Sequence, residues 1–183
     1  METPSERAKA KKQRILEAAS LVFRRHGFAR TSLDLIAQEA GLSRPAIYNF
    51  FVNKDALFAA TVQFIGNDAV AQLRARAFAF DDLRERLTSI CMEWAAGGYD
   101  RSQRNPDAAD LTDPALPPVR QVYRMVEDLL AEVIPGGAAQ GLAKLLVASM
   151  KGAKELADNR EDLIELIDLQ VDLVVAVVGP SAA

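Results

Sequence analysis

The chain contains very little of the chemistry that enzymes and secreted proteins commonly use. Its 183 residues include one cysteine, Cys91, and one histidine, His26, which excludes an internal disulfide and a cysteine–histidine metal cluster. The glycine-rich phosphate loops of nucleotide-binding proteins and the Gly-x-Ser-x-Gly turn of hydrolases are also missing. We therefore expect no catalytic activity, no metal and no cofactor, and the single cysteine favours a reducing, cytoplasmic setting.

Long apolar runs are missing as well. The longest, Val171 to Val178, is far shorter than the roughly 18 residues needed to cross a bilayer, and it contains Asp172. The basic residues near the start of the chain are followed by no apolar segment, so we expect no signal peptide and no membrane partner.

Charge is unevenly distributed along the chain, although the net charge is only −3. The first 54 positions hold ten of the 22 Lys and Arg residues but only five of the 25 Asp and Glu residues. A basic head joined to an acidic remainder is typical of a nucleic-acid-binding module attached to a separate domain. Charge alone leaves the alternative open that these residues form only a solvated helix face.

Apolar residues recur with helical spacing, and the alternation typical of strands is nearly absent, so we predict an all-α fold of about nine helices. The first helix is expected over about 8–26, closed by Gly27 as a left-handed cap. A later helix is expected to end at Gly97-Gly98 and to be followed by a long connection, 99–118, with at most a short helix. The last two helices are predicted over about 138–157 and 160–178.

Two short predicted helices, 33–39 and about 44–50, are separated by four residues that fit a helix-turn-helix. Gly41 permits the tight turn, and Leu42 can pack into the angle between the helices. The second helix would then enter the major groove of DNA. Arg44 at its start can form a bidentate pair with guanine, and Lys54 begins the next helix, where a phosphate is favoured. Further candidates for helix caps or DNA contacts are Thr31, Ser32, Ser43, Tyr48 and Asn49.

The positions that follow the pattern most closely are Arg14-Ile15-Leu16-Glu17-Ala18-Ala19, Phe23, Gly27-Phe28, Thr31-Ser32, Ile36-Ala37, Glu39-Ala40-Gly41-Leu42-Ser43, Ile47-Tyr48, Phe51 and Lys54-Asp55-Ala56-Leu57. Through them, residues 14–58 resemble the DNA-binding domain of the tetracycline-repressor (TetR) family. The resemblance implies a three-helix head over 1–53 and a helical domain for effector binding and dimerisation over 54–183. It also implies a repressor that binds a near-palindromic operator in double-stranded DNA as a homodimer and is released by a small molecule.

The resemblance further assigns roles to single residues of the head. Arg44, Pro45 and Ala46 match the part of the recognition helix that reads bases, while Tyr48 and Lys54 match phosphate contacts. Two alternatives stay open, because Tyr48 could merely pack against the first helix and Arg44 could contact a phosphate. The sequence departs from the family at 49–51, where Phe50 offers no donor to a phosphate.

An effector pocket in the second domain is predicted from apolar and aromatic side chains, each of which could equally be ordinary core. An apolar or aromatic effector is favoured over a polyanion. Cys91 lies on an apolar stripe, which favours a buried, inert thiol over a redox sensor. The predicted pocket residues are Phe64, Met92, Trp94, Tyr123, Met125 and Leu129.

The last two helices carry more apolar surface than one monomeric core would cover, which predicts a dimer interface across a two-fold axis. Two readings compete with the repressor: a helical protein that binds hydrophobic molecules and keeps a vestigial head, and an activator or nucleoid-type DNA binder. The predicted interface residues are Leu142, Leu146, Ser149, Met150, Leu163, Ile167, Gln170 and Val174.

Overall fold

The structure, a computed structural model, describes residues 3–179, and this range contains nine α-helices, one π-helical turn, one 3₁₀ helix and no strand. The predicted all-α fold is therefore confirmed. The chain packs as two compact units: one comprises the chain up to Asn67 together with Asn105–Val122, and the other Asp68–Arg104 together with the chain from Tyr123 onward. This division follows packing, and the functional boundary expected between residues 53 and 54 stays a prediction.

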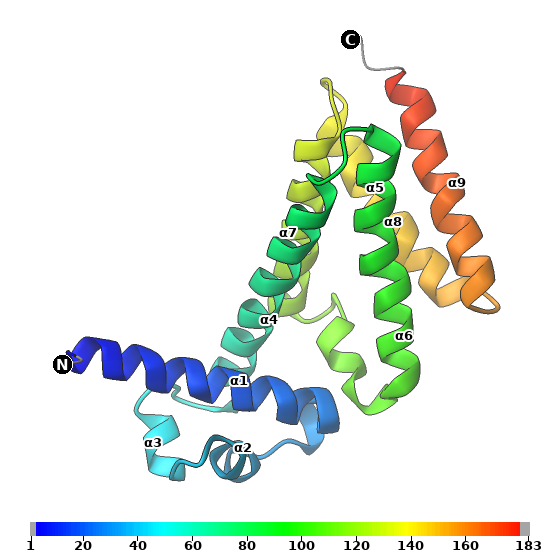
Figure 1. The fold of residues 1–183 in the computed structure, drawn as a ribbon. Coiled ribbons are helices and arrows are strands. Elements are labelled where there is room, and N and C mark those ends of the chain that lie inside the picture. The colour runs from blue at the N-terminus through cyan, green and yellow to red at the C-terminus, as the bar shows by residue number, and fades with distance from the viewer. Residues whose placement is uncertain (1–2, 180–183) are drawn as a thin grey trace. The chain divides into compact units, whose positions relative to one another are not determined.

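The first unit contains α1 (Pro4–Arg30), α2 (Leu33–Ala40), α3 (Arg44–Tyr48) and the 3₁₀ helix η2 (Pro106–Thr112). Helix α4 (Lys54–Ala77) and helix α7 (Pro117–Val133) also begin in it. Figure 1 shows α2 and α3 next to each other beside α1. The apolar face predicted for the first helix is buried, and Ile15, Ala19 and Phe23 lie at the centre of the head.

Helix α1 is longer than its apolar pattern predicted, because its start is polar and is defined by a capping box. The Thr3 side chain accepts a hydrogen bond from the Glu6 N–H (3.2 Å), and the Glu6 carboxylate accepts one from the Thr3 N–H (2.7 Å). The charge-stabilising hydrogen bonds lower the pKa of Glu6. At the other end, Gly27 (φ 69°, ψ 175°) interrupts the helix, and the chain continues helically to Arg30.

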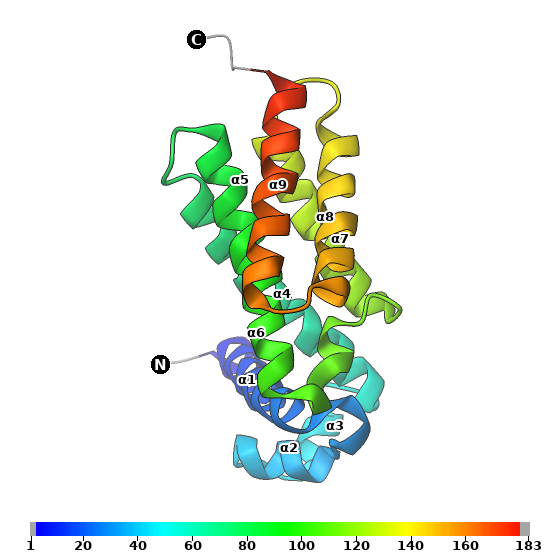
Figure 2. The same cartoon turned by 90° about the vertical axis from the view of Figure 1, so that its right-hand side faces the viewer.

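The second unit contains α5 (Leu83–Cys91), the π-helical turn η1 (Met92–Ala96), α6 (Gly97–Arg104), α8 (Ala139–Leu156) and α9 (Arg160–Val178). Figure 2 shows α8 and α9 side by side, and the two helices are in direct contact. Their inward faces pack with α5 and with the later parts of α4 and α7 around one apolar core. No helix within residues 3–179 is both long and apolar enough to cross a membrane.

The predicted helix end at Gly97-Gly98 is wrong. The chain stays helical from Leu83 through the π-helical turn to Arg104, and η2 follows almost at once, so the expected long connection contains two helical segments. A glycine inside a helix costs only about 1 kcal/mol relative to alanine, and tertiary packing offsets that readily. Gly98 is buried here, which explains why a small residue lies at this point.

Candidate functional site

The predicted helix-turn-helix is formed by α2, the turn 41–43 and α3. Ser32 caps α2 by accepting a hydrogen bond from the Leu35 N–H (3.2 Å). Gly41 ends the helix in the left-handed conformation (φ 58°, ψ 41°), which a residue with a side chain adopts only at a cost. The Arg14 guanidinium donates to the Gly41 carbonyl (3.2 Å) and so ties the turn to α1.

The start of α3 is exposed in the way a DNA-reading helix requires. The side chains of Ser43, Arg44, Pro45, Tyr48 and Asn49 all face solvent. Ser43 occupies the N-cap position, but its hydroxyl makes no capping hydrogen bond, so only the position of this predicted cap is correct. The Ser43 hydroxyl therefore makes no hydrogen bond to the first turn of α3.

Arg44 is held in place by two neighbours on the same surface. Its guanidinium forms an ion pair with Asp34 (3.1 Å), donates to the Tyr48 hydroxyl (3.3 Å) and lies 5.7 Å from the centre of the Tyr48 ring. The hydrogen bond that Arg44 donates to Tyr48 and the negative charge of Asp34 raise the pKa of Arg44. Because the Arg44 side chain is exposed, DNA can reach it, but DNA must compete with Asp34 for its guanidinium.

Thr31 and Ala46, which were predicted to contact DNA, lie inside the head. Thr31 is 3% exposed and its hydroxyl donates to the Gly27 carbonyl (2.6 Å), while Ala46 is only 9% exposed. Both residues support the motif from within, because the packing of α1, α2 and α3 covers their side chains, and a DNA contact by either of them stays a prediction.

Lys54, predicted to contact a phosphate, links the start of α4 to the junction between α1 and α2. Its ammonium group donates to the carbonyls of Phe28 (2.8 Å) and Thr31 (3.0 Å) and lies 4.3 Å from the centre of the Phe28 ring. The Asn53 side chain caps the start of α4 by accepting a hydrogen bond from the Ala56 N–H (2.8 Å). The phosphate contact of Lys54 stays a prediction.

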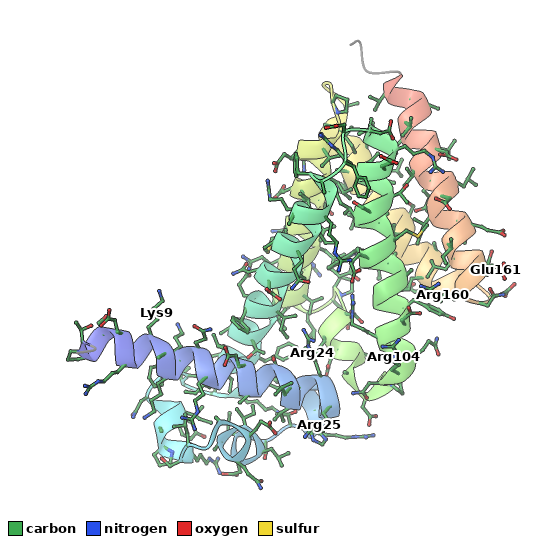
Figure 3. The ribbon with its side chains drawn as sticks, in the orientation of Figure 1. Lys9, Arg24, Arg25, Arg104, Arg160 and Glu161 are labelled. Carbon is green, nitrogen blue, oxygen red and sulfur yellow. The ribbon has the colours of Figure 1, made fainter. Side chains whose placement is uncertain are left out.

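Three side chains of the 105–110 segment hold the C-terminal end of α1, and we call them the α1 clasp: Asn105, Asp107 and Asp110. Asp110 accepts a hydrogen bond from the Phe28 N–H (2.6 Å), Asp107 forms an ion pair with Arg30, and Asn105 donates to the carbonyl of Arg24, which Figure 3 labels on α1. Sequence reasoning missed the clasp because its partners lie about 80 residues away, and only the acidic character of the segment hinted at it.

The second unit has an open cavity of about 360 Å³ between η1, α6 and the start of α9. Its wall is mostly charged, and of the six side chains predicted to form an effector pocket only Met92 belongs to it. Trp94 instead packs edge-on against Tyr123 with 5.3 Å between the ring centres, and Leu129 is buried in the core. Phe64 belongs to the first unit, and Met125 packs against the core of the second.

Cys91 is fully buried in the core of the second unit. Burial raises the pKa of its thiol to about 12, because the apolar surroundings disfavour the thiolate. A thiol in this environment is a poor nucleophile. Among the residues from 3 to 179, no group of three or more His, Cys, Asp or Glu side chains could hold a metal ion.

The predicted dimer interface stays a prediction, and its residues differ in how deeply the monomer buries them. Most of the predicted side chains point into the core of the monomer, because α8 and α9 use those faces to pack against α5 and α7. Exposed leucines and a valine lie on the other sides of the same helices. The predicted residues that are buried are Leu146, Met150, Leu163, Ile167 and Val174, whereas Leu142, Ser149 and Gln170 are half-buried.

Comparison with known proteins agrees with the geometry of the head. Residues 15–61 match the family described as "Bacterial regulatory proteins, tetR family". The HTH-type transcriptional repressor SCO4008 of Streptomyces coelicolor is 44% identical over 54 residues, and that match spans only 28% of its length. The HTH-type transcriptional regulator BetI of Yersinia pestis is 30% identical over 159 residues, which cover 78% of each chain.

Solved structures extend the likeness to nearly the whole chain. A TetR-family transcriptional regulator from Streptomyces coelicolor has a TM-score of 0.68 at 20% identity and covers 92% of this chain and 99% of its own. This likeness concerns the fold, and the likeness to BetI concerns the sequence over most of both proteins. The chain therefore belongs to the TetR family, whose members are DNA-binding transcriptional regulators and not enzymes.

Proposed function

We propose that this protein is a ligand-responsive transcriptional repressor that binds a near-palindromic operator as a homodimer. The observation that carries the proposal is the exposed start of α3, where Arg44, Pro45, Tyr48 and Asn49 stand free of the core behind a well-formed turn. Side chains at the start of a recognition helix point toward base edges in the major groove. Such a regulator acts on chromosomal DNA, which places it in the cytoplasm.

Base reading falls to Arg44 in this proposal, and phosphate contacts fall to residues around it. The guanidinium of Arg44 suits the two acceptors of guanine, and its contact with Tyr48 already orients it along the exposed side of α3. Ser43, Tyr48 and Ser32 offer hydroxyls near the ends of α2 and α3, where phosphates are favoured. Lys54 adds a positive charge at the start of α4.

Dimerisation is supported by an apolar stripe that the monomer leaves uncovered. Leu145 and Leu156 on α8 are 60% and 83% exposed, and on α9 Leu169, Leu173 and Val177 are also more than half exposed. Large exposed apolar patches often mark an interface with another protein. We propose that this stripe, together with the half-buried Leu142 and Ser149, packs against its copy across a two-fold axis.

Release from DNA is assigned to a small molecule bound within residues 54–183. We favour an effector with an apolar or aromatic part, because Met92 borders the cavity beside η1 and aromatic side chains lie in the same unit. Effector binding would change the spacing of the two heads, as the family resemblance implies. Half-sites one DNA turn apart, about 34–36 Å, could then no longer be contacted together.

Selection from a random double-stranded DNA library tests the proposal directly. We expect the full-length protein to enrich a near-palindrome, and fluorescence anisotropy with that sequence should give an affinity that falls steeply as salt rises. A scrambled duplex of the same composition serves as the control. If no symmetric sequence is enriched and no DNA affinity appears at low salt, the repressor proposal is wrong and a protein with a vestigial head becomes the better reading.

Repression itself needs a separate measurement in cells. Transcript levels should rise for genes adjacent to the selected operator when the gene for this protein is deleted. Levels that fall would indicate an activator, and levels that stay constant with DNA bound at many unrelated sites would indicate a nucleoid-type binder.

A further inference from the structure

The open cavity of the second unit has an excess of positive charge on its wall. Arg101, Arg104 and Arg160 line it together with only two carboxylates, Glu93 and Asp100. Figure 3 labels Arg104 on α6 and Arg160 at the beginning of α9, so the arginines come from two different helices. A volume of about 360 Å³ is within the range that small-molecule sites occupy.

Both carboxylates of the wall are already paired. Asp100 accepts two hydrogen bonds from the Arg160 guanidinium, at 3.0 and 3.2 Å, and Glu93 lies 2.7 Å from Arg76 and 3.9 Å from Arg101. Arg104 has no ion pair or hydrogen bond among the residues between 3 and 179, although it lines the same cavity. One arginine of the wall is therefore available to a bound anion.

A second cation lies close to this wall. The ammonium group of Lys154 and the guanidinium of Arg101 both lie beside Gly98. A Cβ atom on residue 98 would lie 3.9 Å from the Lys154 nitrogen and 3.8 Å from a guanidinium nitrogen of Arg101. Burial and the positive charge of Arg101 lower the pKa of Lys154. No carboxylate in the described part of the chain lies within 4 Å of the Lys154 nitrogen, whereas Arg101 lies 3.9 Å from Glu93.

The backbone at the cavity is also unusual. The π-helical turn Met92–Ala96 supplies part of the wall, and it is followed directly by Gly97 and by the buried Gly98. Single π-helical turns inside α-helices are rare and are frequently found at functional sites. Here the turn sets Met92 and Glu93 beside the arginines of α6.

We propose that this cavity binds a small organic acid, with its carboxylate or phosphate held by Arg104 and Arg101 and its apolar body resting on Met92. The inference deepens the proposed function by naming the chemical class of the effector, and it depends on that function only for the regulatory consequence of binding. Guanidinium groups favour oxyanions because two parallel N–H donors match two oxygens. An uncharged ligand would leave the excess positive charge of the wall unbalanced.

Isothermal titration calorimetry with the full-length protein and three probes tests the proposal. The probes are benzoate, its uncharged analogue benzamide, and inorganic phosphate, in a buffer of low chloride. We expect benzoate to bind at least tenfold more tightly than benzamide and to be displaced by phosphate. If neither anion binds at concentrations up to about 10 mM, or if benzamide binds as well as benzoate, the proposal is overturned.

Variants locate the binding to this cavity. Arg104→Gln should weaken benzoate binding at least tenfold, Arg104→Lys less, since lysine keeps the charge but loses the paired donors. Arg124→Gln is the matched control, because Arg124 is an exposed arginine of α7 outside the cavity wall. Equal benzoate affinity in Arg104→Gln and the wild type, with both proteins folded by circular dichroism, would also overturn the proposal.

Failure of the site and failure of the proposed function can be told apart, because the calorimetry contains no DNA. If the protein binds benzoate through Arg104 but binds no operator, the anion site is supported and the repressor proposal is wrong. If the protein binds a palindromic operator but neither anion, the repressor proposal is supported and the anion site is wrong. With both present, benzoate should release the wild type from DNA at concentrations that leave Arg104→Gln bound.

Discussion

Arg44 is the residue whose surroundings say most about how the head would read DNA. It projects from the first position of α3, yet Asp34 and Tyr48 hold it at 3.1 and 3.3 Å. Both contacts are exposed to water, so they contribute little to stability. They fix the direction of a long side chain, and a side chain oriented before binding loses less conformational entropy when it meets a base.

Replacing Arg44 tests this reading. Arg44→Ala should cost roughly 1–3 kcal/mol of binding to the best operator and should relax specificity at one base position in each half-site. Anisotropy on a set of operators with single base changes measures both effects, with Arg124→Ala as the control variant. An equal loss on every operator would show instead that Arg44 contacts a phosphate.

Lys54 has two possible functions, and one variant can separate them. Lys54→Ala removes charge-assisted hydrogen bonds to the carbonyls of Phe28 and Thr31, so we expect unfolding free energy to fall by about 1–3 kcal/mol in urea titrations. If Lys54 also contacts a phosphate, the salt slope of DNA binding should flatten by about one unit on all sequences. A slope equal to that of the wild type, with stability reduced, would leave only the structural role.

Cys91 gives a prediction with a definite pH dependence. Its thiol has a pKa of about 12 in the folded protein against an ordinary value of 9.0, so the folded state favours the neutral form. The stabilisation is therefore complete below pH 9 and is lost as the pH rises from 9 toward 12. The stability advantage of the wild type over Cys91→Ala should shrink across that range in urea titrations at successive pH values.

Thiol reactivity provides the companion measurement for Cys91. In the folded protein at pH 8 an aromatic disulfide reagent should react slowly, at a rate set by unfolding, and in urea it should react at once. Rapid modification of the folded protein would favour the redox-sensor hypothesis over the inert thiol.

The sequence predicted the types of residue in the head better than their surroundings. Arg44 and Lys54 were recognised as basic groups at helix starts, which is a local property of the chain. The ion pair with Asp34, ten residues away, and the carbonyls that Lys54 contacts depend on how α1, α2 and α4 pack. Thr31 shows the limit clearly, because its hydroxyl could serve as a cap, a phosphate donor or a buried donor, and only packing decides among them.

At the scale of elements, two glycines with positive φ have different reasons to be glycine. At Gly27 (φ 69°) a side-chain carbon would lie 1.9 Å from the backbone oxygen of Asp107 in the α1 clasp, which cannot move without shifting the chain. At Gly41 (φ 58°) the nearest atom is the end of the flexible Arg14 side chain, 2.6 Å away. The first position therefore combines strain with a backbone clash, and the second has mainly strain.

Alanine at the two positions should reveal this difference. Gly27→Ala is expected to lower the unfolding free energy by about 2–4 kcal/mol, and Gly41→Ala by about 1–2 kcal/mol. Thermal or urea unfolding followed by circular dichroism measures both, and each variant is the control for the other. If Gly41→Ala proved the more damaging of the two, the clasp would not be closed in solution.

Element boundaries were predictable where a local signal exists. The cap at Ser32 and the end of α2 at Gly41 are confirmed because each depends on a few neighbouring residues. The helix through Gly97 and Gly98 was predicted wrongly, since the packing that keeps it intact comes from residues far along the chain. The π-helical turn leaves no sequence signal of its own among Met92–Ala96.

For the whole molecule, the proposed dimer is the property most easily tested. Leu169 on α9 is 56% exposed and Leu21 on α1 is 50% exposed, so the two leucines are matched in exposure. Leu169→Glu places a charge in the proposed interface twice, once from each copy, and should weaken dimerisation about a hundredfold or more. Leu21→Glu should leave the mass measured by analytical ultracentrifugation unchanged. A dimer that persists in Leu169→Glu would require a different interface.

The side chains predicted to form the dimer interface and the exposed apolar side chains lie on different sides of α9, for an identifiable reason. Helix α9 has apolar residues both on its buried side and on a second, exposed side, so hydrophobic periodicity alone does not distinguish the side that packs in the monomer from the side left for a partner. Ile167 and Val174 face the core, and Leu169 and Leu173 face solvent. The sequence therefore predicts that α8 and α9 carry surplus apolar surface, while the assignment of faces requires the packing of the whole unit.

The α1 clasp has a consequence for how the protein is made. Ribosomes release the chain from its N-terminus, so α1, α2 and α3 emerge long before Asn105 to Asp110. Until that segment appears, the Phe28 N–H lacks its acceptor and the end of α1 lacks its cover. We therefore predict that the head becomes resistant to protease only in ribosome-bound chains long enough to expose the clasp.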